Sequence, residues 1–247
     1  MESVRTKPAP FLASTVPRRH VLVHARTLSE MFESFLESCL GIASLSIIGD
    51  ITGPHLLPVL NNMCVQRLSV NMEQLFRDED FERSIFGHSD DKECAVHLQD
   101  PLFAAASHLD IFDHFNINQE EPEEMLWLKH LSALPALTHL AFSSPPNSRV
   151  IHSVLDSCPR IDVLLIVFPV IGKNTAKEYL EYIADDISDN RFVVAIYKDY
   201  YSDWELGARG GKDIWVRAEE FIARQKRGEI EAGDYFLDDS PAIEPSN

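Results

Sequence analysis

Hydrophobic residues recur along the chain in the pattern Ile-x-x-Leu-x-Ile, with other apolar residues in place of Ile or Leu in some copies. The copies run over residues 42–47, 65–70, 106–111, 137–142 and 161–166, and a weaker one, Val194-Ala-Ile196, follows Arg191. Side chains two residues apart in an extended chain share a face, so each Leu-x-Ile step predicts a short strand with one buried face.

Two of these copies belong to a longer internal repeat. The segments Leu36-Glu-Ser-Cys39-Leu-Gly-Ile42 and Leu155-Asp-Ser-Cys158-Pro-Arg-Ile161 both read Leu-acid-Ser-Cys-x-x-Ile, although they lie far apart in the chain. Matching segments of this kind indicate a repeat architecture. Both cysteines stand where a helical segment gives way to a strand, a cramped position that suits a small apolar side chain. We therefore interpret them as structural thiols rather than reactive or metal-bound ones.

Segments of helical spacing or turn composition precede the predicted strands. We expect strands at 20–24, 42–48, 65–70, 107–112, 137–142, 161–168 and 192–198, and a short extra strand at 94–98. Helices are expected up to residue 38, after Gly53-Pro54, from Pro122, and over 148–157 and 174–187, with a degenerate repeat or surface insertion at 71–94. Helix, turn and short strand repeated every ~20–40 residues are typical of leucine-rich repeats.

The predicted fold is therefore α/β: an irregular leucine-rich-repeat solenoid of parallel strands alternating with helices and closed by a C-terminal helix. We expect a disordered lead-in at 1–19, the repeat domain with its cap at 20–230, and a frayed acidic tail at 231–247. Residues 200–213 are predicted as a loop. Asp213 is predicted to cap the last helix, whose apolar side carries Ile214, Trp215, Ala218, Phe221 and Ile222.

The composition favours a folded protein and disfavours polyanionic partners. Of the 247 residues 45% are hydrophobic, and the formal net charge is −17. Binding phosphate requires clustered cations, so we expect neither nucleic acid nor an anionic membrane surface as a partner. The four cysteines form no Cys-x-x-Cys pair, and we find neither a secretory leader nor an apolar run of ~20 residues. These features predict an intracellular protein of the cytoplasm or nucleus.

No segment predicts a catalytic, cofactor or metal site. The stretch Gly207-Ala-Arg-Gly-Gly211-Lys212-Asp213 is one residue short of a phosphate loop and has Asp213 where a Ser or Thr would meet magnesium. We interpret it as a glycine turn into the last helix. No further ligand of suitable spacing accompanies the remaining candidates, which are His20 with His24 and the group His108, Asp110, Asp113 and His114.

The residues that alternate with the apolar strand positions define a candidate partner-binding face. Its members share one side of the predicted sheet and are Arg67, Ser69, His108, Asp110, His139, Val163, Leu165 and Tyr197. This face changes from polar to apolar along the chain. The apolar stretch of Val163, Leu165 and Val167 is either a partner site or a surface covered by the chain's own tail, for which Trp204 and Trp215 are well placed.

Two parts of the chain resemble a known family. The units Leu137-Thr-His-Leu140 and Cys158-Pro-Arg-Ile161 resemble the repeat regions of fungal F-box proteins. The tail Asp203-Trp-Glu-x-Gly-x-x-Gly-Gly-x-Asp-x-Trp215-x-Arg-Ala-Glu-x-Phe221 resembles the C-termini of a large set of such chains. The resemblance implies a horseshoe that holds a substrate, and an F-box that joins it to a ubiquitin-ligase adaptor. The chain departs from the family in that no F-box-like Leu-Pro-x-Glu segment is found near residue 1, so adaptor binding stays open.

These observations leave three functional hypotheses. The first is a non-enzymatic protein-interaction module that recognises a ubiquitin-ligase substrate. The second is an α/β enzyme with a doubly wound sheet, which strand spacing does not distinguish from a solenoid. The third is a fragment without retained activity. A long open sheet with one strand per repeat favours the solenoid, whereas a pocket with converging acids at the strand ends favours the enzyme.

Overall fold

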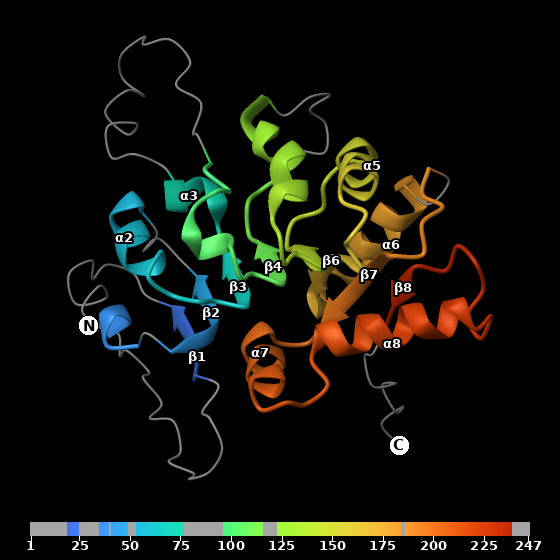
Figure 1. Cartoon of the computed structure of the whole chain (residues 1–247). Coiled ribbons are helices and arrows are strands. Elements are labelled where there is room, and N and C mark those ends of the chain that lie inside the picture. The colour runs from blue at the N-terminus through green and yellow to red at the C-terminus, as the bar shows by residue number, and fades with distance from the viewer. Residues whose placement is uncertain are drawn as a thin grey trace.

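One parallel sheet of eight strands organises the molecule, and the order of the strands in the sheet is their order in the chain (Figure 1). The structure, a computed structural model, describes residues 19–24, 35–39, 41–48, 53–76, 96–115, 123–183 and 186–238. The strands are β1 (Arg19–His24), β2 (Ile42–Ile48), β3 (Arg67–Val70), β4 (His108–Ile111), β5 (His139–Phe142), β6 (Val163–Pro169), β7 (Phe192–Tyr197) and β8 (Phe236–Leu237). The predicted α/β class with parallel strands is confirmed.

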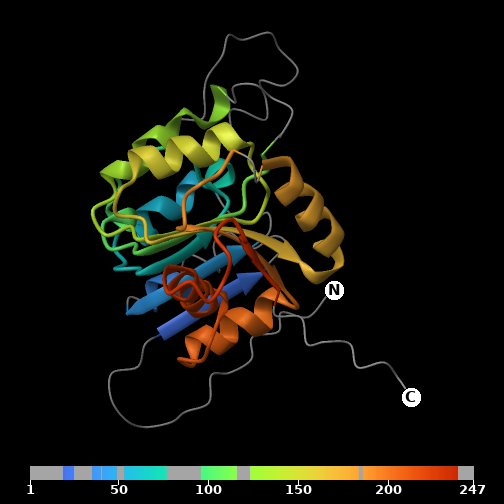
Figure 2. The same ribbon diagram turned by 90° about the vertical axis from the view of Figure 1, so that its right-hand side faces the viewer.

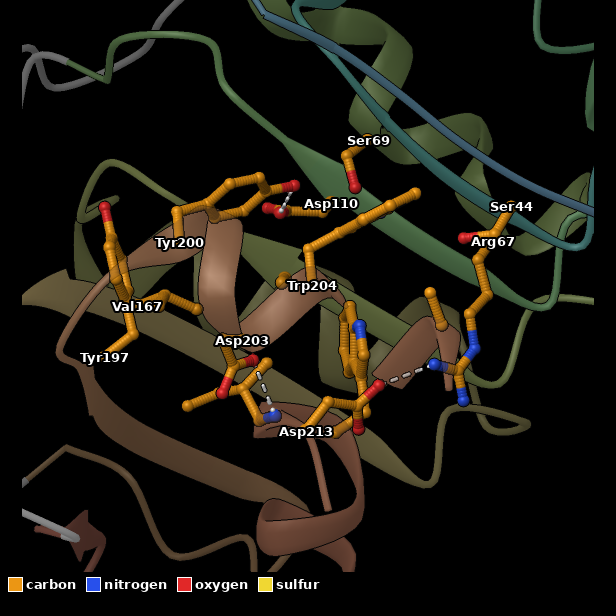
Figure 3. A pocket seen from close by; sticks show the side chains of 14 residues that line it. Ser44, Arg67, Ser69, Asp110, Val167, Tyr197, Tyr200, Asp203, Trp204 and Asp213 are labelled. Carbon is orange, nitrogen blue, oxygen red and sulfur yellow. Dashed lines mark hydrogen bonds and ion pairs between the residues drawn. The ribbon is translucent and has the colours of Figure 1, made fainter. Parts of the chain in front are cut away.

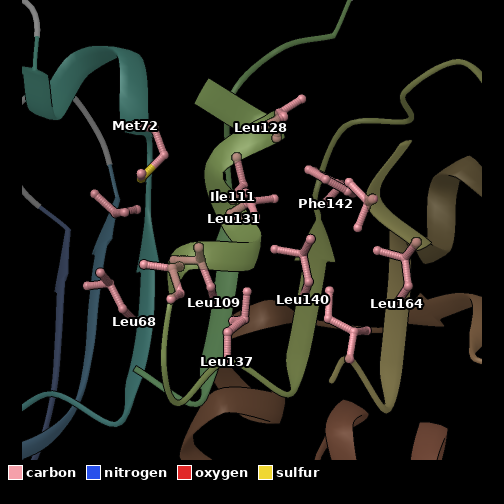
Figure 4. Close-up of a cluster of buried hydrophobic side chains, with 14 of the residues drawn as sticks. Leu68, Met72, Leu109, Ile111, Leu128, Leu131, Leu137, Leu140, Phe142 and Leu164 are labelled. Atoms are coloured by element: carbon pink, nitrogen blue, oxygen red, sulfur yellow. The ribbon is translucent and has the colours of Figure 1, made fainter. Parts of the chain in front are cut away.

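The repeated leucines lie side by side across the sheet. Strand pairing places Leu45 beside Leu68, Leu68 beside Leu109, Leu109 beside Leu140, and Leu140 beside Leu164. Together with the apolar residue two positions later in each strand, this ladder forms the wall of the main hydrophobic core (Figure 4). The sequence repeat therefore corresponds to a repeat in space, and each strand completes the buried surface of its neighbour.

Helices cover both faces of the sheet, in two separate groups (Figure 2). The first group packs on the leucine ladder and comprises α2 (Leu57–Leu60) after η1 (Pro54–Leu56), α3 (Met72–Phe76), η2 (Pro101–Phe103), η3 (Glu123–Ala133), α5 (Ser148–Ser157), and α6 (Lys173–Ile183) after η4 (Val170–Gly172). The second group, α7 (Tyr200–Ala208) and α8 (Ile214–Lys226), lies against the opposite face. The helix expected from Pro122 is the 3₁₀ segment η3, the helix expected after Gly53-Pro54 begins as the 3₁₀ segment η1, and α6 ends four residues before the predicted end at 187.

The two long repeat units share the turn that leads into the strand, since the Ile161 N–H donates to the carbonyl of Cys158 and the Ile42 N–H donates to that of Cys39, each over 3.1 Å. The serine bonds before the turn differ, because Ser157 Oγ donates to the carbonyl of Ser153 four residues back and Ser38 Oγ donates to that of Phe35 three residues back, each over 2.6 Å. The Sγ atom of the following cysteine lies 3.6 Å from Ser38 Oγ in the first unit and 3.5 Å from Ser157 Oγ in the second. Cys158 is buried in the main core and its counterpart Cys39 is partly buried, as expected for structural thiols.

Three local predictions differ from the structure. The loop predicted over 200–213 is wrong, because its first part forms α7; only the glycine turn that follows is irregular, with Gly210 at a φ of 77°. Residues 96–98, the described part of the predicted extra strand, are not extended into a sheet. The weak copy at 194–196 is out of register, since Phe192, not Val194, pairs with Leu164.

The fold also continues past residue 230. The short strand β8 pairs with β7, and Tyr235 is buried with its hydroxyl donating to the carbonyl of Ile187 over 2.8 Å. Residues 1–18 of the lead-in predicted at 1–19 and most of the first predicted helix lie outside the described residues, and Arg19 begins β1.

Candidate functional site

Side chains on the face opposite the leucine ladder form two rows across the strands, and we call this surface the inner face. Strand pairing aligns Ser44, Arg67, His108, His139 and Val163 in one row, and Ser46, Ser69, Asp110, Ala141 and Leu165 in the next. Both rows are polar on β2, β3 and β4 and become apolar on β6. The predicted candidate residues therefore share one face, as their alternation indicates.

Helix α8 covers the apolar half of the inner face. Ala218, Phe221 and Ile222 of α8 belong to one buried cluster with Val163 and Leu165 of β6. Val163 is 1% exposed and Leu165 is fully buried. The sequence left two alternatives for the apolar stretch of Val163, Leu165 and Val167, a partner site or a surface covered by the chain's own tail. In the structure, α8 covers this stretch. In this arrangement these two candidate residues do not lie on an open surface.

Helix α7 lies over the polar half and is held differently. It contains no buried residue. Its Tyr200 hydroxyl lies 3.1 Å from Ser46 Oγ and 3.4 Å from Asp110 Oδ2, and the Trp204 ring meets the His20 ring edge-on at 6.1 Å. Polar and ring contacts thus fasten α7, whereas hydrophobic packing fastens α8.

The junction of α7 and α8 carries two ion pairs. Asp213 caps α8 by accepting from the Val216 N–H over 3.0 Å, and its other oxygen accepts from Arg67 Nη1 of β3 over 2.6 Å. Asp203 of α7 accepts from the Ile214 N–H over 2.8 Å and from Arg217 Nη2 over 2.5 Å. The carboxylates therefore connect the sheet, α7 and the start of α8. The cap predicted at Asp213 is confirmed.

Gly207 allows this close packing. A Cβ atom at this position would lie 2.0 Å from Asp213 Oδ2, far inside van der Waals contact. The glycine-rich stretch thus lets α7 approach the carboxylate that pairs with Arg67, and it leads into α8 as the interpretation of a glycine turn predicts.

Two candidate histidines form a stacked pair beside the cavity. The rings of His108 and His139 stack with their centroids 4.1 Å apart, and Trp215 meets them edge-on at 5.3 and 5.8 Å. Burial lowers the pKa of His108 to about 3, and burial also lowers the pKa of His139. The 2.8 Å contact between His139 Nε2 and Glu219 Oε1 is therefore a hydrogen bond from a neutral imidazole near pH 7.

Asp110 is the buried acid in the two rows of the inner face. It is 7% exposed, and its carboxylate accepts from Ser143 Oγ over 3.1 Å as well as from Tyr200. Burial raises the pKa of Asp110 to about 7. A carboxyl group with a pKa so far above its ordinary value, in a polar cavity, is a candidate functional residue.

The acids and histidines near Asp110 do not converge on a metal site. Asp113 instead caps α3 by accepting from the N–H groups of Met72 and Glu73 over 2.6 and 2.7 Å, and His114 is exposed. Within the described residues, no three His, Cys, Asp or Glu side chains are arranged to hold a metal ion.

A small cavity of about 40 Å³ lies between the polar half of the inner face and α7 (Figure 3). Its lining includes four of the predicted residues, Arg67, Ser69, Asp110 and Tyr197. We call it the α7 cavity. It has room for a few water molecules and is small beside the ~300–1,000 Å³ of ordinary small-molecule sites.

The remaining lining comes largely from the segment predicted to be a loop. Tyr200, Asp203 and Trp204 of α7 point toward the cavity, together with Asp213 at the start of α8 (Figure 3). Asp199, whose side chain accepts from the Ser202 N–H, is a helix-capping signal that could have identified α7. The glycines between Gly207 and Gly211 instead favoured the interpretation of this segment as a loop.

We compared the chain with family models, curated proteins and solved structures, and none of them matches. Among the helices that the structure describes, none is long and apolar enough to span a bilayer.

Proposed function

We propose that this chain is a protein-interaction module built as an irregular leucine-rich-repeat solenoid, and that it recognises substrates for an F-box-type ubiquitin ligase. The strand order carries the first part of this proposal, because eight parallel strands follow one another without reversal. Enzymes with open α/β sheets bind ligands at the point where the strand order reverses. An array that never reverses instead offers one continuous face, which repeat proteins use for partners.

The partner site that we propose is the polar half of the inner face together with α7. Hydrophobic packing closes the apolar half under α8, but α7 contributes no buried residue. A partner segment can therefore displace or dock beside α7 at small cost in buried apolar surface. Helix α7 itself carries Trp204, a residue type enriched at binding hot spots.

The ligase role rests on the family resemblance of the repeat units and of the tail motif from Asp203 to Phe221. In the structure, this motif forms the second helical group and supplies Asp203, Trp204 and Asp213 to the α7 cavity. A motif whose residues line the proposed partner site supports a role in recognition.

Affinity purification from the native cell with quantitative mass spectrometry tests the proposal. We expect the tagged chain to recover a cullin-ligase adaptor and at least one further protein. Trp204→Ala is expected to lose the further protein, whereas Tyr182→Ala, which removes a 63% exposed aromatic from α6, is expected to keep it. Recovery of partners without the adaptor would contradict the ligase role. Recovery of no protein above the tag control would contradict the proposal that the chain is an interaction module.

The enzyme remains the second candidate because of one observation, the raised pKa of Asp110 in a cavity that also holds Ser69 and Tyr200. The cavity volume argues against a metabolite as substrate. A metabolite that raises the melting temperature of the wild type and not that of Asp110→Asn would support the enzyme over the module.

A further inference from the structure

We infer that the α7 cavity binds a primary ammonium group, namely the side chain of a lysine on a basic protein partner. This inference rests on the proposed interaction function and adds the chemistry that the partner must present. It is carried by the aromatic lining, the charge balance and the size of the cavity.

Aromatic rings and carboxylates line the cavity together. The rings are those of Tyr197, Tyr200, Trp204 and Trp215, and the carboxylates are those of Asp110, Asp203 and Asp213. A cation gains electrostatic energy over the face of a Trp or Tyr ring, most of all where water is excluded. The same combination repels anions and gives a neutral ligand no comparable advantage.

The charge balance leaves one carboxylate for a ligand. Asp213 is paired with Arg67, and Asp203 is paired with Arg217. Asp110 accepts hydrogen bonds from two hydroxyl groups, and no cationic side chain of the described residues pairs with it. An ionised carboxylate in this position lacks a counter-charge that a bound ammonium group would supply.

The size of the cavity selects the head group. A volume of about 40 Å³ accommodates a few waters, and therefore also a primary ammonium group, which is of similar size. A lysine places this group at the end of a thin, flexible stem, whereas the planar guanidinium of arginine is broader. The net charge of −17 favours the approach of a basic partner.

The occupancy is expected to depend on pH through Asp110. The ionisable groups around it are Arg67 of β3, His108 of its own strand, His139 of β5, Tyr197 of β7, Tyr200 and Asp203 of α7, and Asp213. Burial lowers the pKa of both histidines, to about 3 for His108, and burial raises the pKa of both tyrosines, so His108 and the two tyrosines stay neutral between pH 5.5 and 8. Asp110, with its pKa raised to about 7, changes charge in this range, and only its ionised form attracts the ligand.

Nuclear magnetic resonance of the whole chain tests the site with N-acetyl-lysine methylamide as probe and the norleucine analogue as its uncharged match. The indole N–H signals of Trp204 and Trp215 report on the cavity. That of Trp127, buried on the opposite side of the sheet in η3, is the internal control. At pH 8 we expect saturable shifts of the first two signals with the lysine probe alone.

Variants and a change of pH distinguish binding of the lysine probe in the α7 cavity from non-specific electrostatic attraction to the acidic chain. Asp110→Asn, which keeps the shape of the side chain, is expected to weaken probe binding about tenfold to a hundredfold. The matched exposed change Asp186→Asn is expected to leave it unaltered. Lowering the pH from 8 to 5.5 is expected to weaken binding at least about tenfold, because Asp110 becomes protonated.

Equal binding of the norleucine probe, unchanged binding by Asp110→Asn, or the absence of any shift of the cavity indoles would each overturn the inference. These outcomes are distinct from failure of the proposed function. A chain that captures protein partners but ignores the lysine probe is an interaction module with another recognition chemistry.

Discussion

Arg67 on β3 donates a hydrogen bond to Asp213 at the start of α8, with 2.6 Å between Nη1 and Oδ2. The two residues lie far apart in the chain, and their pairing joins the centre of the sheet to its C-terminal cover. Asp213 is 3% exposed and also caps α8, so a single buried carboxylate serves both contacts.

Arg67→Met is expected to lower the free energy of unfolding by about 1–3 kcal/mol, because it leaves the buried Asp213 carboxylate without its counter-charge. Urea denaturation measures this loss. A double-mutant cycle with Asp213→Asn is expected to show coupling between the two positions. Arg209→Met removes an exposed pair with Glu205 and is expected to cost less than about 0.5 kcal/mol. Equal effects of the two arginine changes would contradict the role given to Arg67.

Gly207→Ala is expected to destabilise the C-terminal cover. The added Cβ would lie 2.0 Å from Asp213 Oδ2, so either α7 or the carboxylate must move and the pair with Arg67 is disturbed. We expect a loss of about 1–3 kcal/mol in thermal or urea unfolding. Gly172→Ala is the matched control, since its nearest neighbours lie 3.7 Å from the new atom. A Gly207 variant as stable as the Gly172 variant would show that α7 accommodates the methyl group.

The sequence predicts the sheet and α8 well but does not predict α7, for a physical reason. The apolar period of the strands follows from local alternation, and the ladder of Leu45, Leu68, Leu109, Leu140 and Leu164 needs only that similar units stack. Helix α7 has no apolar stripe of buried residues, since polar groups and rings hold it on a surface formed by distant strands. Periodicity therefore gives no signal for it.

The same distinction between local pattern and tertiary contact applies to the candidate site. Alternation correctly groups Arg67, Ser69 and Asp110 on one face, because strand geometry fixes which side chains share a side. It does not indicate that the Tyr200 hydroxyl would donate a hydrogen bond to Asp110, nor that burial would raise the pKa of that carboxyl group to about 7. Both depend on tertiary contacts that the linear pattern does not contain.

Asp110→Asn is expected to stabilise the protein at alkaline pH and to change its pH dependence. The pKa of Asp110 is about 7 in the folded chain and near 3.8 in the unfolded chain, so the folded state binds the proton more tightly. Stability from this group is therefore greatest below about pH 4, falls as the pH rises to 7 and then stays level. The variant lacks this loss, and at pH 8 we expect it to be more stable than the wild type by an amount on the order of a few kcal/mol.

Urea denaturation at several pH values measures the difference between the two proteins. The buried histidines titrate in both, so their contribution cancels in the difference. The exposed change Asp186→Asn is the control and is expected to give a small, constant difference. A difference between wild type and Asp110→Asn that does not grow from pH 4 to pH 7 would show that Asp110 is solvated.

Phe221→Ala tests the cover of the apolar half of the inner face. Phe221 is 5% exposed in the cluster with Val163 and Leu165, so its truncation is expected to cost about 3–5 kcal/mol. Tyr201→Ala on α7, where the side chain is 42% exposed, is expected to cost less than about 1 kcal/mol. Thermal unfolding compares the two variants, and a Phe221 variant with unchanged stability would mean that α8 is not required to cover the sheet.

Hydrogen exchange is expected to distinguish the two covering helices directly. Amide groups exchange through local openings whose free energy reflects the buried contacts that are lost. Opening α8 exposes Ala218, Phe221 and Ile222 and the apolar strand residues beneath them. Opening α7 breaks mainly the polar and ring contacts of Tyr200, Asp203 and Trp204. We expect the amides of α7 to exchange well before those of α8 and β6.

The exchange experiment has a matched perturbation in Tyr200→Phe. This change removes the hydroxyl group that contacts Ser46 and Asp110 and keeps the ring against Phe112. It is expected to speed exchange in α7 severalfold and to leave α8 unchanged, because hydrophobic packing holds α8 independently. If α7 and α8 instead exchange together in both proteins, they open as one unit. Access to the α7 cavity would then require the apolar half of the inner face to open as well.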